Sequence, residues 1–341
     1  MSCCFGSSLT NFERFLQCIT PVVPSKNVSQ SCISDLNTRG QPLGKDTVEY
    51  FTLKDLWDCY KEWSAFGAGT NVMLESGESV MQFFVPYLSS IHIYSDKPVA
   101  PSRNRREEGD GVELESDTWS DDSGSDNSSP SLSNNSSKSW DAVSEDSNCD
   151  QDGSWSRKNR PGYLYLQYTE VSSPYQRVPL VQKIDELART HPALMTLRSI
   201  DLSPASWMAV AWYPIYSIPS VKNEKDLETC FLTYHTLSSS FQDNMEEYQD
   251  IELGKCMCCC CGGGAQKKEP VGEKLTGGGG GWMSVPPFGV ATYKMQGDIW
   301  VNPESWDSER LTFLYGAADS WLKQLNLYHH DFNFFTFHSA L

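Results

Sequence analysis

The sequence has no cluster of Lys and Arg, no long apolar run and no secretory signal, and each absence excludes a class of protein. Its 27 Lys and Arg face 44 Asp and Glu, giving a net charge of −17. This balance excludes binding of nucleic acid by phosphate neutralisation. No stretch reaches the roughly eighteen consecutive apolar residues of a membrane-spanning helix, and the N-terminus lacks a basic start followed by an apolar segment. The sequence therefore predicts an intracellular protein of the cytoplasm or nucleus.

Twelve cysteines are present, and without a signal sequence they are expected to be reduced thiols. Five of them crowd into one short stretch: Cys256, Cys258, Cys259, Cys260 and Cys261. Such a cluster can bind a soft metal ion or accept S-acylation, which would anchor the chain to a lipid surface. Contiguous cysteines cannot all face one ion, however, and the flanking glycine runs indicate a flexible insertion. We therefore expect no metal, no cofactor and no lipid anchor.

No local motif marks a catalytic nucleophile or a phosphate-binding loop, since G-x-S-x-G and G-K-[ST] are both missing. The adjacent His329, His330 and Asp331 invite a metal or acid–base interpretation, but no H-x-x-x-H pair accompanies them. Because a predicted helix precedes them, the alternative is that these histidines interact with a helix C-terminus. His235, in a predicted strand, is expected to be a hydrogen-bonded core residue rather than a general base. No catalytic residue is predicted.

One segment carries most of the charge. Residues 107–156 hold fourteen acids against a single base, Lys138, among many serines and asparagines. Such a composition does not bury enough apolar surface to offset the entropy of ordering, so it predicts disorder. Thr118 and Ser123 each have an acid three residues later and are candidate phosphorylation sites. Three tryptophans interrupt the acids, as in segments that fold against a partner; the alternative is a solvated spacer.

Apolar periodicity outside this segment predicts more strands than helices. Helices are expected over 11–20, 53–63, 181–190 and 311–325, with Thr52 and Asp55 forming a capping box. Strands are expected over 80–94, 163–171, 207–218, 231–237, 288–293, 299–301 and 332–337, with Pro86 at an edge or bulge. The segments 288–293 and 299–301 are expected to pair across Gly297 and Asp298. The pattern predicts an α+β fold with a mostly antiparallel sheet covered by helices.

Strand-like sequence on both sides of the acidic segment indicates an insertion within one domain. We expect an N-terminal helix and loop over 1–49, then a single α+β domain over 50–341. Two disordered inserts interrupt that domain, an acidic, Ser-rich one at 103–160 and a Cys- and Gly-rich one at 242–284.

Several long tracts carry a resemblance to a known family. They are YFTLKDLWDCYKEWSAFGAG (50–69), GYLYLQYTEVSSPYQRVPLVQKIDELA (162–188), DLSPASWMAVAWYPIYSIP (201–219), CFLTYHTLS (230–238), FGVATYKMQG (288–297) and HDFNFF (330–335). In these tracts the chain resembles the plant family catalogued as domain of unknown function 789. The resemblance implies a plant protein and brings with it no catalytic residue.

Two functions fit the sequence. The first is a non-catalytic regulatory protein that binds another protein and carries a phosphorylatable acidic insert. The second is an enzyme of unrecognised type, with a pocket lined by Trp207, Trp212, Tyr213 and His235. A deep pocket holding two or more titratable side chains within hydrogen-bond reach would favour the enzyme, whereas a shallow surface with these aromatic residues fully packed would favour the interaction protein.

Overall fold

The computed structural model describes residues 9–32, 47–74, 76–99, 161–215, 227–239, 281–295, 298–301 and 305–338. Its central element is an antiparallel sheet in the order β10-β8-β7-β5, and both β4 and β6 pair with the other edge of β5. The strands are β4 (Ala68–Met73), β5 (Ser79–Ser95), β6 (Tyr163–Thr169), β7 (Trp207–Pro214), β8 (Cys230–Thr236) and β10 (Gly289–Tyr293). Together with the helices below, this sheet confirms the predicted α+β fold.

Strand β7 lies at the centre of the sheet and buries both of its faces. Because side chains alternate along a strand, Met208, Val210 and Trp212 face one hydrophobic core. Trp207, Ala209 and Ala211 face a second core on the other side of the sheet. The predicted buried strand is therefore confirmed over Trp207–Pro214, and residues 216–218 of the expected segment lie outside the described part of the chain.

Strand β5 is a single strand of 17 residues, and its pairing with β7 has one irregularity. Its register against β7 shifts between Leu88, which faces Val210, and Ser90, which faces Ala209. Ser89 is thus the extra residue of a β-bulge, a feature common near functional sites. Pro86 lies between the part of β5 that pairs with β4 and the part that pairs with β6. Its missing backbone N–H therefore costs no hydrogen bond to either of these strands.

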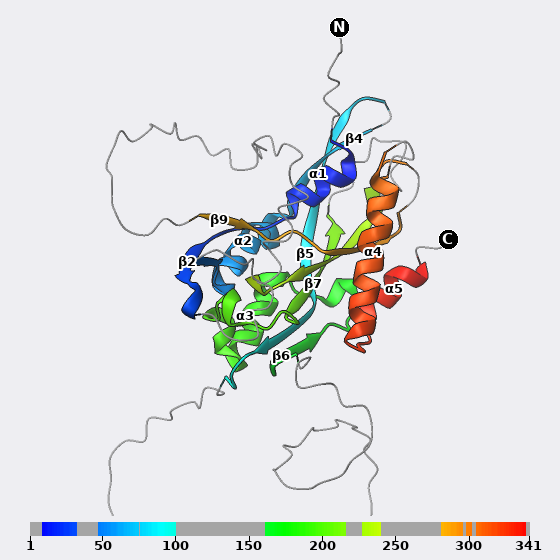
Figure 1. Ribbon diagram of the computed structural model, residues 1–341. Helices are drawn as coiled ribbons and strands as arrows, with labels where there is room; N and C mark the ends of the chain where they lie inside the picture. The colour runs from blue at the N-terminus through cyan, green and yellow to red at the C-terminus, as the bar shows by residue number, and fades with distance from the viewer. Residues whose placement is uncertain are drawn as a thin grey trace, which may run out of the picture. The chain divides into compact units, whose positions relative to one another are not determined.

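Among the described residues, three helices cover the first face of the sheet. They are α1 (Asn11–Cys18), α2 (Leu53–Phe66) and α3 (Leu180–Thr190). The predicted capping box is confirmed: the Thr52 side chain accepts from the Asp55 backbone N–H, and the Asp55 side chain accepts from the Thr52 backbone N–H. A second capping box, made by Thr10 and Glu13, starts α1. In Figure 1, α1 and α2 lie on the side of the sheet away from the C-terminal helices.

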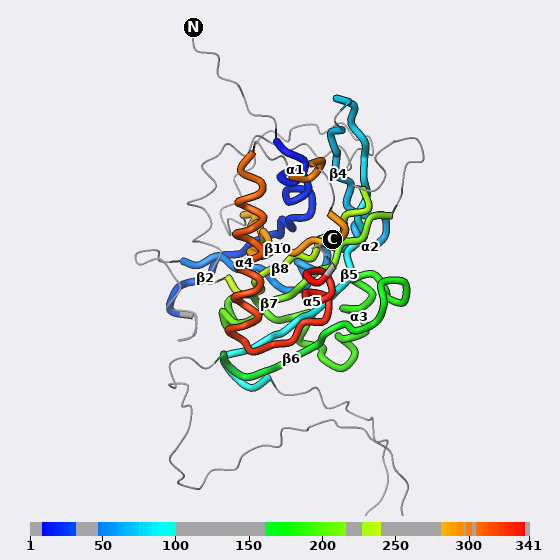
Figure 2. The backbone as a smooth tube through the Cα atoms, turned by 90° about the vertical axis from the view of Figure 1, so that its right-hand side faces the viewer, coloured from blue at the N-terminus to red at the C-terminus, as the bar shows by residue number. Residues whose placement is uncertain are grey.

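In the described part of the chain, two helices cover the second face, α4 (Asp307–Gln324) and α5 (His330–His338). Figure 2 shows both in front of the sheet, with a short connection between the end of α4 and the start of α5. The strand expected over 332–337 is wrong, because this segment belongs to α5. Phe332 and Phe335, three residues apart, face the second core together, so packing against the sheet overrides the β-preference of the aromatic run.

Smaller elements flank the sheet. Strand β1 (Val22–Pro24) pairs with β9 (Trp282–Ser284), and β2 (Lys26–Ser29) pairs with β3 (Thr47–Tyr50). The insert expected at 242–284 therefore ends before β9. The strand expected at 299–301 is also wrong, since these residues form a bend and β10 pairs with β8 instead. Within the described residues, no helix is both long and apolar enough to cross a membrane.

Candidate functional site: a buried polar network beside a pocket

Five polar side chains from distant parts of the chain meet beneath the start of α5. The β-bulge supplies Ser89, β8 supplies Tyr234, and the segment after β6 supplies Arg177. His329 directly precedes α5, and Asp331 is the second residue of that helix. All five residues are at most 9 % exposed. Burying polar groups is costly unless each finds a partner, so their hydrogen bonds decide what this network can do.

Asp331 forms the charged end of the network. Arg177 Nη1 donates to Asp331 Oδ2 at 2.5 Å, and Arg177 Nη2 donates to Oδ1 at 2.7 Å. Burial alone would raise the pKa of the Asp331 carboxyl, but the hydrogen bonds and charge of Arg177 outweigh it and hold the pKa below its usual value. Asp331 is therefore an ionised carboxylate that only accepts hydrogen bonds.

The ionised carboxylate fixes the direction of every other proton in the network. Ser89 Oγ lies 2.5 Å from Asp331 Oδ2 and must donate its proton there. The same Oγ, 2.9 Å from His329 Nε2, must then accept from that nitrogen. Burial lowers the pKa of His329 to about 4, so the ring is neutral. Its Nδ1 carries no proton and accepts from the Tyr234 hydroxyl at 2.6 Å.

This proton order opposes nucleophilic catalysis. An activated serine donates its proton to the histidine base, whereas the Ser89 proton points to Asp331 and His329 donates to Ser89. Ser89 is also fully buried. The network instead connects the N-terminal end of α5 to β5, to β8 and to the segment that contains Arg177. Arg177 is itself positioned by donating from Nε and Nη2 to the Ser172 carbonyl at 2.9 and 2.8 Å.

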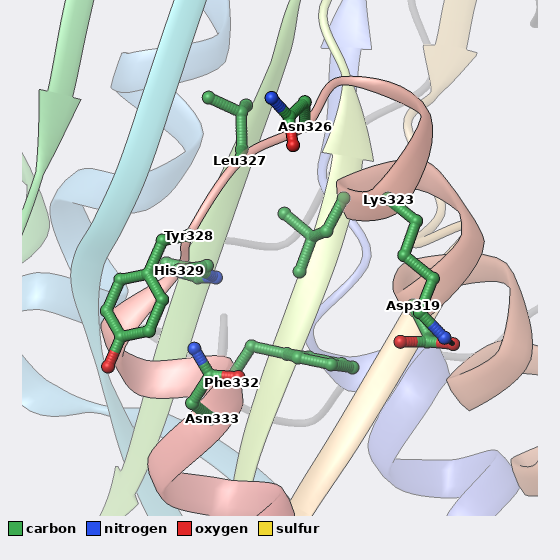
Figure 3. Close-up of a pocket in the computed structure, with 9 residues that line it drawn as sticks. Asp319, Lys323, Asn326, Leu327, Tyr328, His329, Phe332 and Asn333 are labelled. Atoms are coloured by element: carbon green, nitrogen blue, oxygen red, sulfur yellow. Dashed lines mark hydrogen bonds and ion pairs between the residues drawn. The ribbon is translucent and has the colours of Figure 1, made fainter.

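His329 also lines a pocket of about 410 Å³ between the end of α4 and the start of α5. The apolar lining is formed by Leu322, Leu327 and Phe332, and the polar lining by Asp319, Lys323, Asn326, Tyr328, His329 and Asn333. Figure 3 shows the Lys323 and Asp319 side chains on one side of the pocket and Tyr328 and His329 on the other. The volume lies within the range of pockets that bind small ligands.

The connection between the two helices has a defined conformation. Asn326 adopts a left-handed φ of 51°, which asparagine tolerates better than other non-glycine residues. The Leu327 backbone N–H donates to the Leu322 carbonyl, and the Asn326 N–H donates to the Lys323 carbonyl. These two bonds form a Schellman motif, and the accompanying contact between Leu322 and Leu327 supplies the apolar lining. Helix termination thus builds the pocket.

The four residues predicted to line one pocket are divided by the sheet. Trp207 and Tyr213 lie on the face covered by α4 and α5, and Trp212 lies on the opposite face. His235 is fully buried beside Trp212: the Trp212 indole N–H donates to Thr233 Oγ1, which contacts His235 Nε2 at 2.9 Å. Its Nδ1 donates to the Val285 carbonyl at 3.0 Å. His235 is therefore a hydrogen-bonded core residue, as predicted.

The remaining candidates fall into two groups. His329 directly precedes α5, and His330 and Asp331 are its first two residues, so the expectation that they contact a helix C-terminus is wrong. Thr118, Ser123, Cys256, Cys258, Cys259, Cys260 and Cys261 lie outside the described residues. Within the part of the chain that the structure describes, no group of three His, Cys, Asp or Glu residues could hold a metal ion.

Sequence reasoning missed Ser89, Arg177 and Tyr234. Two consecutive serines inside an otherwise apolar strand were the available signal for the bulge at Ser89. Tyr234 and Arg177 carry no local signal, because their partners are 95 and 154 residues away in the sequence.

Comparison with known proteins agrees with the family resemblance of the sequence tracts quoted above. No curated protein and no solved structure gives a significant match. The family model described as "Protein of unknown function (DUF789)" matches residues 10–335, which include His329, Asp331 and the whole pocket lining. The chain belongs to this family.

Proposed function

We propose that this protein is a non-catalytic interaction protein whose recognition site is the pocket between α4 and α5. One observation carries the proposal: the pocket lies beside a polar network whose protons all run toward one paired carboxylate. Such a network has no free base or nucleophile to offer, but it holds one wall of the pocket rigidly. Rigid, preformed walls reduce the ordering cost of binding.

The lining of the pocket favours a peptide side chain as the bound group. Leu322, Leu327 and Phe332 offer apolar contact, while the carboxamides of Asn326 and Asn333 can both donate to and accept from a peptide group. Tyr328 is 78 % exposed beside the pocket. An exposed tyrosine next to an apolar pocket is typical of the residues that dominate binding energy in protein interfaces.

The wider assignment follows the composition. We place the protein inside plant cells, in the cytoplasm or nucleus, with a protein partner and without direct contact to nucleic acid. The acidic insert supplies regulation through phosphorylation at Thr118 and Ser123, where each phosphate would add about −1.5 to −2 charges.

A bulky substitution in the pocket tests the proposal. Asn333→Trp, in full-length protein, should fill the cavity while leaving the network intact. Glu62→Trp, at an exposed position of α2, is the matched control. We expect affinity purification from plant tissue, quantified by mass spectrometry, to lose a defined set of partners with Asn333→Trp alone. Unchanged partners with both variants, at unchanged melting temperature, would overturn the assignment.

A hydrolase is the second candidate, because Ser89 Oγ and His329 Nε2 are 2.9 Å apart beside a cavity. A serine-reactive fluorophosphonate distinguishes the two functions. The interaction protein should remain unlabelled under native conditions, since Ser89 is buried and bonded to Asp331. Labelling of Ser89 that disappears in His329→Gln would instead establish an activated serine.

A further inference from the structure

The sequence has Ser or Thr directly before proline at four positions: Thr20, Ser129, Ser173 and Ser203. This dipeptide is the local motif of proline-directed kinases, because proline fixes φ and removes the backbone N–H after the residue that accepts the phosphate. Ser129 lies outside the described residues. The accessibility of the other three hydroxyl groups decides which of them a kinase can reach.

Two of these hydroxyl groups are occupied and covered. Ser203 is 3 % exposed, and its Oγ accepts from the Ala205 backbone N–H. Thr20 is half-buried, and its hydroxyl donates to the Leu16 carbonyl at 2.6 Å. Ser173 differs from both, because it is exposed and its side chain caps no backbone N–H of the turn that follows. Among the described Ser-Pro and Thr-Pro positions, Ser173 is therefore the accessible acceptor.

The backbone at Ser173 already has an extended conformation, as a kinase substrate requires. Its φ of −63° and ψ of 154° are close to polyproline II, because a following proline disfavours the helical region. Val171 before it and Tyr175 after it are also exposed. A kinase can therefore approach this segment from solvent, and the regular element it meets is the single 3₁₀ turn Pro174–Gln176.

Arg177 offers a binding edge for a phosphate at this position. The end of its guanidinium group, Nη1 and Nη2, is paired with the Asp331 carboxylate. The side of the group, Nε and Nη2, donates to one neutral acceptor, the Ser172 carbonyl oxygen. That carbonyl belongs to the peptide bond that joins Ser172 to Ser173, so a phosphate on Ser173 would lie a few covalent bonds from the same edge.

A phosphate is the stronger acceptor for this edge. Guanidinium groups bind phosphate oxygens through two parallel, charge-assisted hydrogen bonds, which are roughly twice as strong as bonds to a neutral carbonyl. Because the Arg177 side chain is 2 % exposed, the phosphate has to displace the Ser172 carbonyl rather than add to it. A rotation of the peptide bond between Ser172 and Ser173 would do so.

Glu170 is the carboxylate that opposes a phosphate here. Its Oε1 accepts from the backbone N–H groups of Val171 and Ser172 at 3.0 and 2.9 Å, and its Oε2 accepts from the Tyr168 hydroxyl at 2.6 Å. These three donors offset part of its charge. Its repulsion would act through space, whereas Arg177 would act at hydrogen-bond distance, so we expect attraction to prevail.

We propose that Ser173 is the phosphorylation site of a proline-directed kinase, and that its phosphate binds the Nε–Nη2 edge of Arg177 while Asp331 keeps the other edge. In this step the bond between Ser173 Oγ and the γ-phosphorus of ATP forms, and the bond from that phosphorus to the bridging oxygen breaks. ADP leaves, and the hydroxyl proton passes to the catalytic carboxylate of the kinase. Arg177 would then bridge the phosphate and Asp331, which connects the segment after β6 more firmly to α5. This inference goes beyond the proposed function, which assigns regulation to the acidic insert.

Phosphorylation of the full chain tests the site. Protein carrying Ser129→Ala is incubated with ATP and a purified mitogen-activated protein kinase, and mass spectrometry measures the occupancy of each remaining position. We expect roughly tenfold higher occupancy at Ser173 than at Thr20 or Ser203, whose hydroxyl groups become accessible only by local unfolding. Ser173→Ala should remove this incorporation. An unmodified Ser173 in the folded protein overturns the proposal, whether or not the kinase modifies a synthetic peptide of residues 168–180.

Phosphorus NMR tests the contact with Arg177. Phosphoserine is incorporated genetically at position 173 or, as the matched control, at Ser76 in the exposed turn between β4 and β5. The second pKa of phosphoserine is ordinarily about 6, and pairing with Arg177 should place it about one unit lower at position 173 than at position 76. Arg177→Lys keeps the charge but removes the planar fork, so it should abolish most of this difference. Circular dichroism checks that this variant is folded.

Equal phosphate pKa values at the two positions, or a difference that Arg177→Lys leaves unchanged, would overturn the contact with Arg177. Neither measurement involves a partner protein. The proposed function fails separately, because it depends on whether Asn333→Trp loses partner proteins.

Discussion

Asp331 is the residue on which the buried network depends. It accepts from Ser89 and from two nitrogens of Arg177, and the exposed fractions of the Arg177 and Asp331 side chains are 2 % and 3 %. A buried ion pair adds little net stability compared with apolar residues, because desolvation offsets its attraction. Removing one partner is different, since it leaves an uncompensated charge in the interior.

Arg177→Met should therefore lower the free energy of unfolding by about 3–5 kcal/mol, because Asp331 loses its buried counter-charge. Urea denaturation followed by circular dichroism measures the loss as a lower midpoint at unchanged slope. Lys323→Met, which breaks an exposed pair, is the control and should change stability by less than about 1 kcal/mol. Equal effects of the two substitutions would show that the Arg177–Asp331 pair is not buried in solution.

The buried histidines predict a specific pH dependence. Burial lowers the pKa of His92, His235 and His329 from 6.5 to about 4. Between these values the unfolded chain binds protons that the folded chain does not, so stability is full above pH 6.5 and falls as the pH drops toward 4. A shift of this size corresponds to about 3 kcal/mol for each group. Asp331 contributes in a lower window, since its stabilisation is lost only as the pH falls through its depressed pKa.

His92→Phe tests this dependence at one position. The imidazole of His92 stacks on Trp207 with ring centroids 4.9 Å apart, and its Nδ1 has no hydrogen-bond partner among the described residues. Phenylalanine keeps the stacking and removes the titration. We expect little loss of stability at pH 7.5. Between pH 6.5 and 4, the free energy of unfolding should fall less steeply than in the unsubstituted protein, because one fewer histidine takes up a proton on unfolding. A decline as steep as in the unsubstituted protein would contradict the lowered pKa.

At the scale of single elements, local signals predicted more than long-range ones. The capping box at Thr52 was readable because its two members are three residues apart. Helix α5 was mistaken for a strand because its aromatic residues favour strands locally, and only the sheet that it covers makes Phe332 and Phe335 one buried face. The buried network could not be predicted for the same reason, since the hydrogen bond between Ser89 and His329 joins residues 240 positions apart in the sequence.

The packing of α4 on the sheet depends on one glycine. A Cβ added at Gly289 of β10 would lie 2.9 Å from the Ala318 Cβ and 3.2 Å from the Ala318 Cα, so α4 would have to move. Gly289→Ala should cost about 1–3 kcal/mol by overpacking. Gly316→Ala is the matched control within α4, because nothing lies within 4 Å of its added Cβ. It should stabilise by about 0.5–1 kcal/mol through helix propensity. Thermal unfolding should therefore show a lower melting temperature for Gly289→Ala and a higher one for Gly316→Ala.

At the scale of the whole molecule, strand pairing explains why one domain tolerates a long insertion. Strand β5 and strand β6 lie on either side of the acidic segment in the sequence, yet they pair directly, with Ser95 opposite Tyr163. The sequence predicted a strand on each flank of this segment, but only the structure shows that the two strands pair. The strand order β10-β8-β7-β5 could not be predicted from the sequence, because no local feature distinguishes β8 from residues 299–301 as the partner of β10.

Replacing residues 103–160 by a short Gly-Ser linker should therefore preserve the fold. Shortening this connection about tenfold reduces the entropic cost of loop closure by about 2 kcal/mol. We expect the free energy of unfolding to stay within about 2 kcal/mol of the original, as measured by urea denaturation. An equally long linker of Gly and Ser, which keeps the loop length but removes the acids and tryptophans, separates the effect of loop length from that of composition. If both replacements melt far below the original chain, residues 103–160 are part of the folded core, and the prediction of a dispensable insert is wrong.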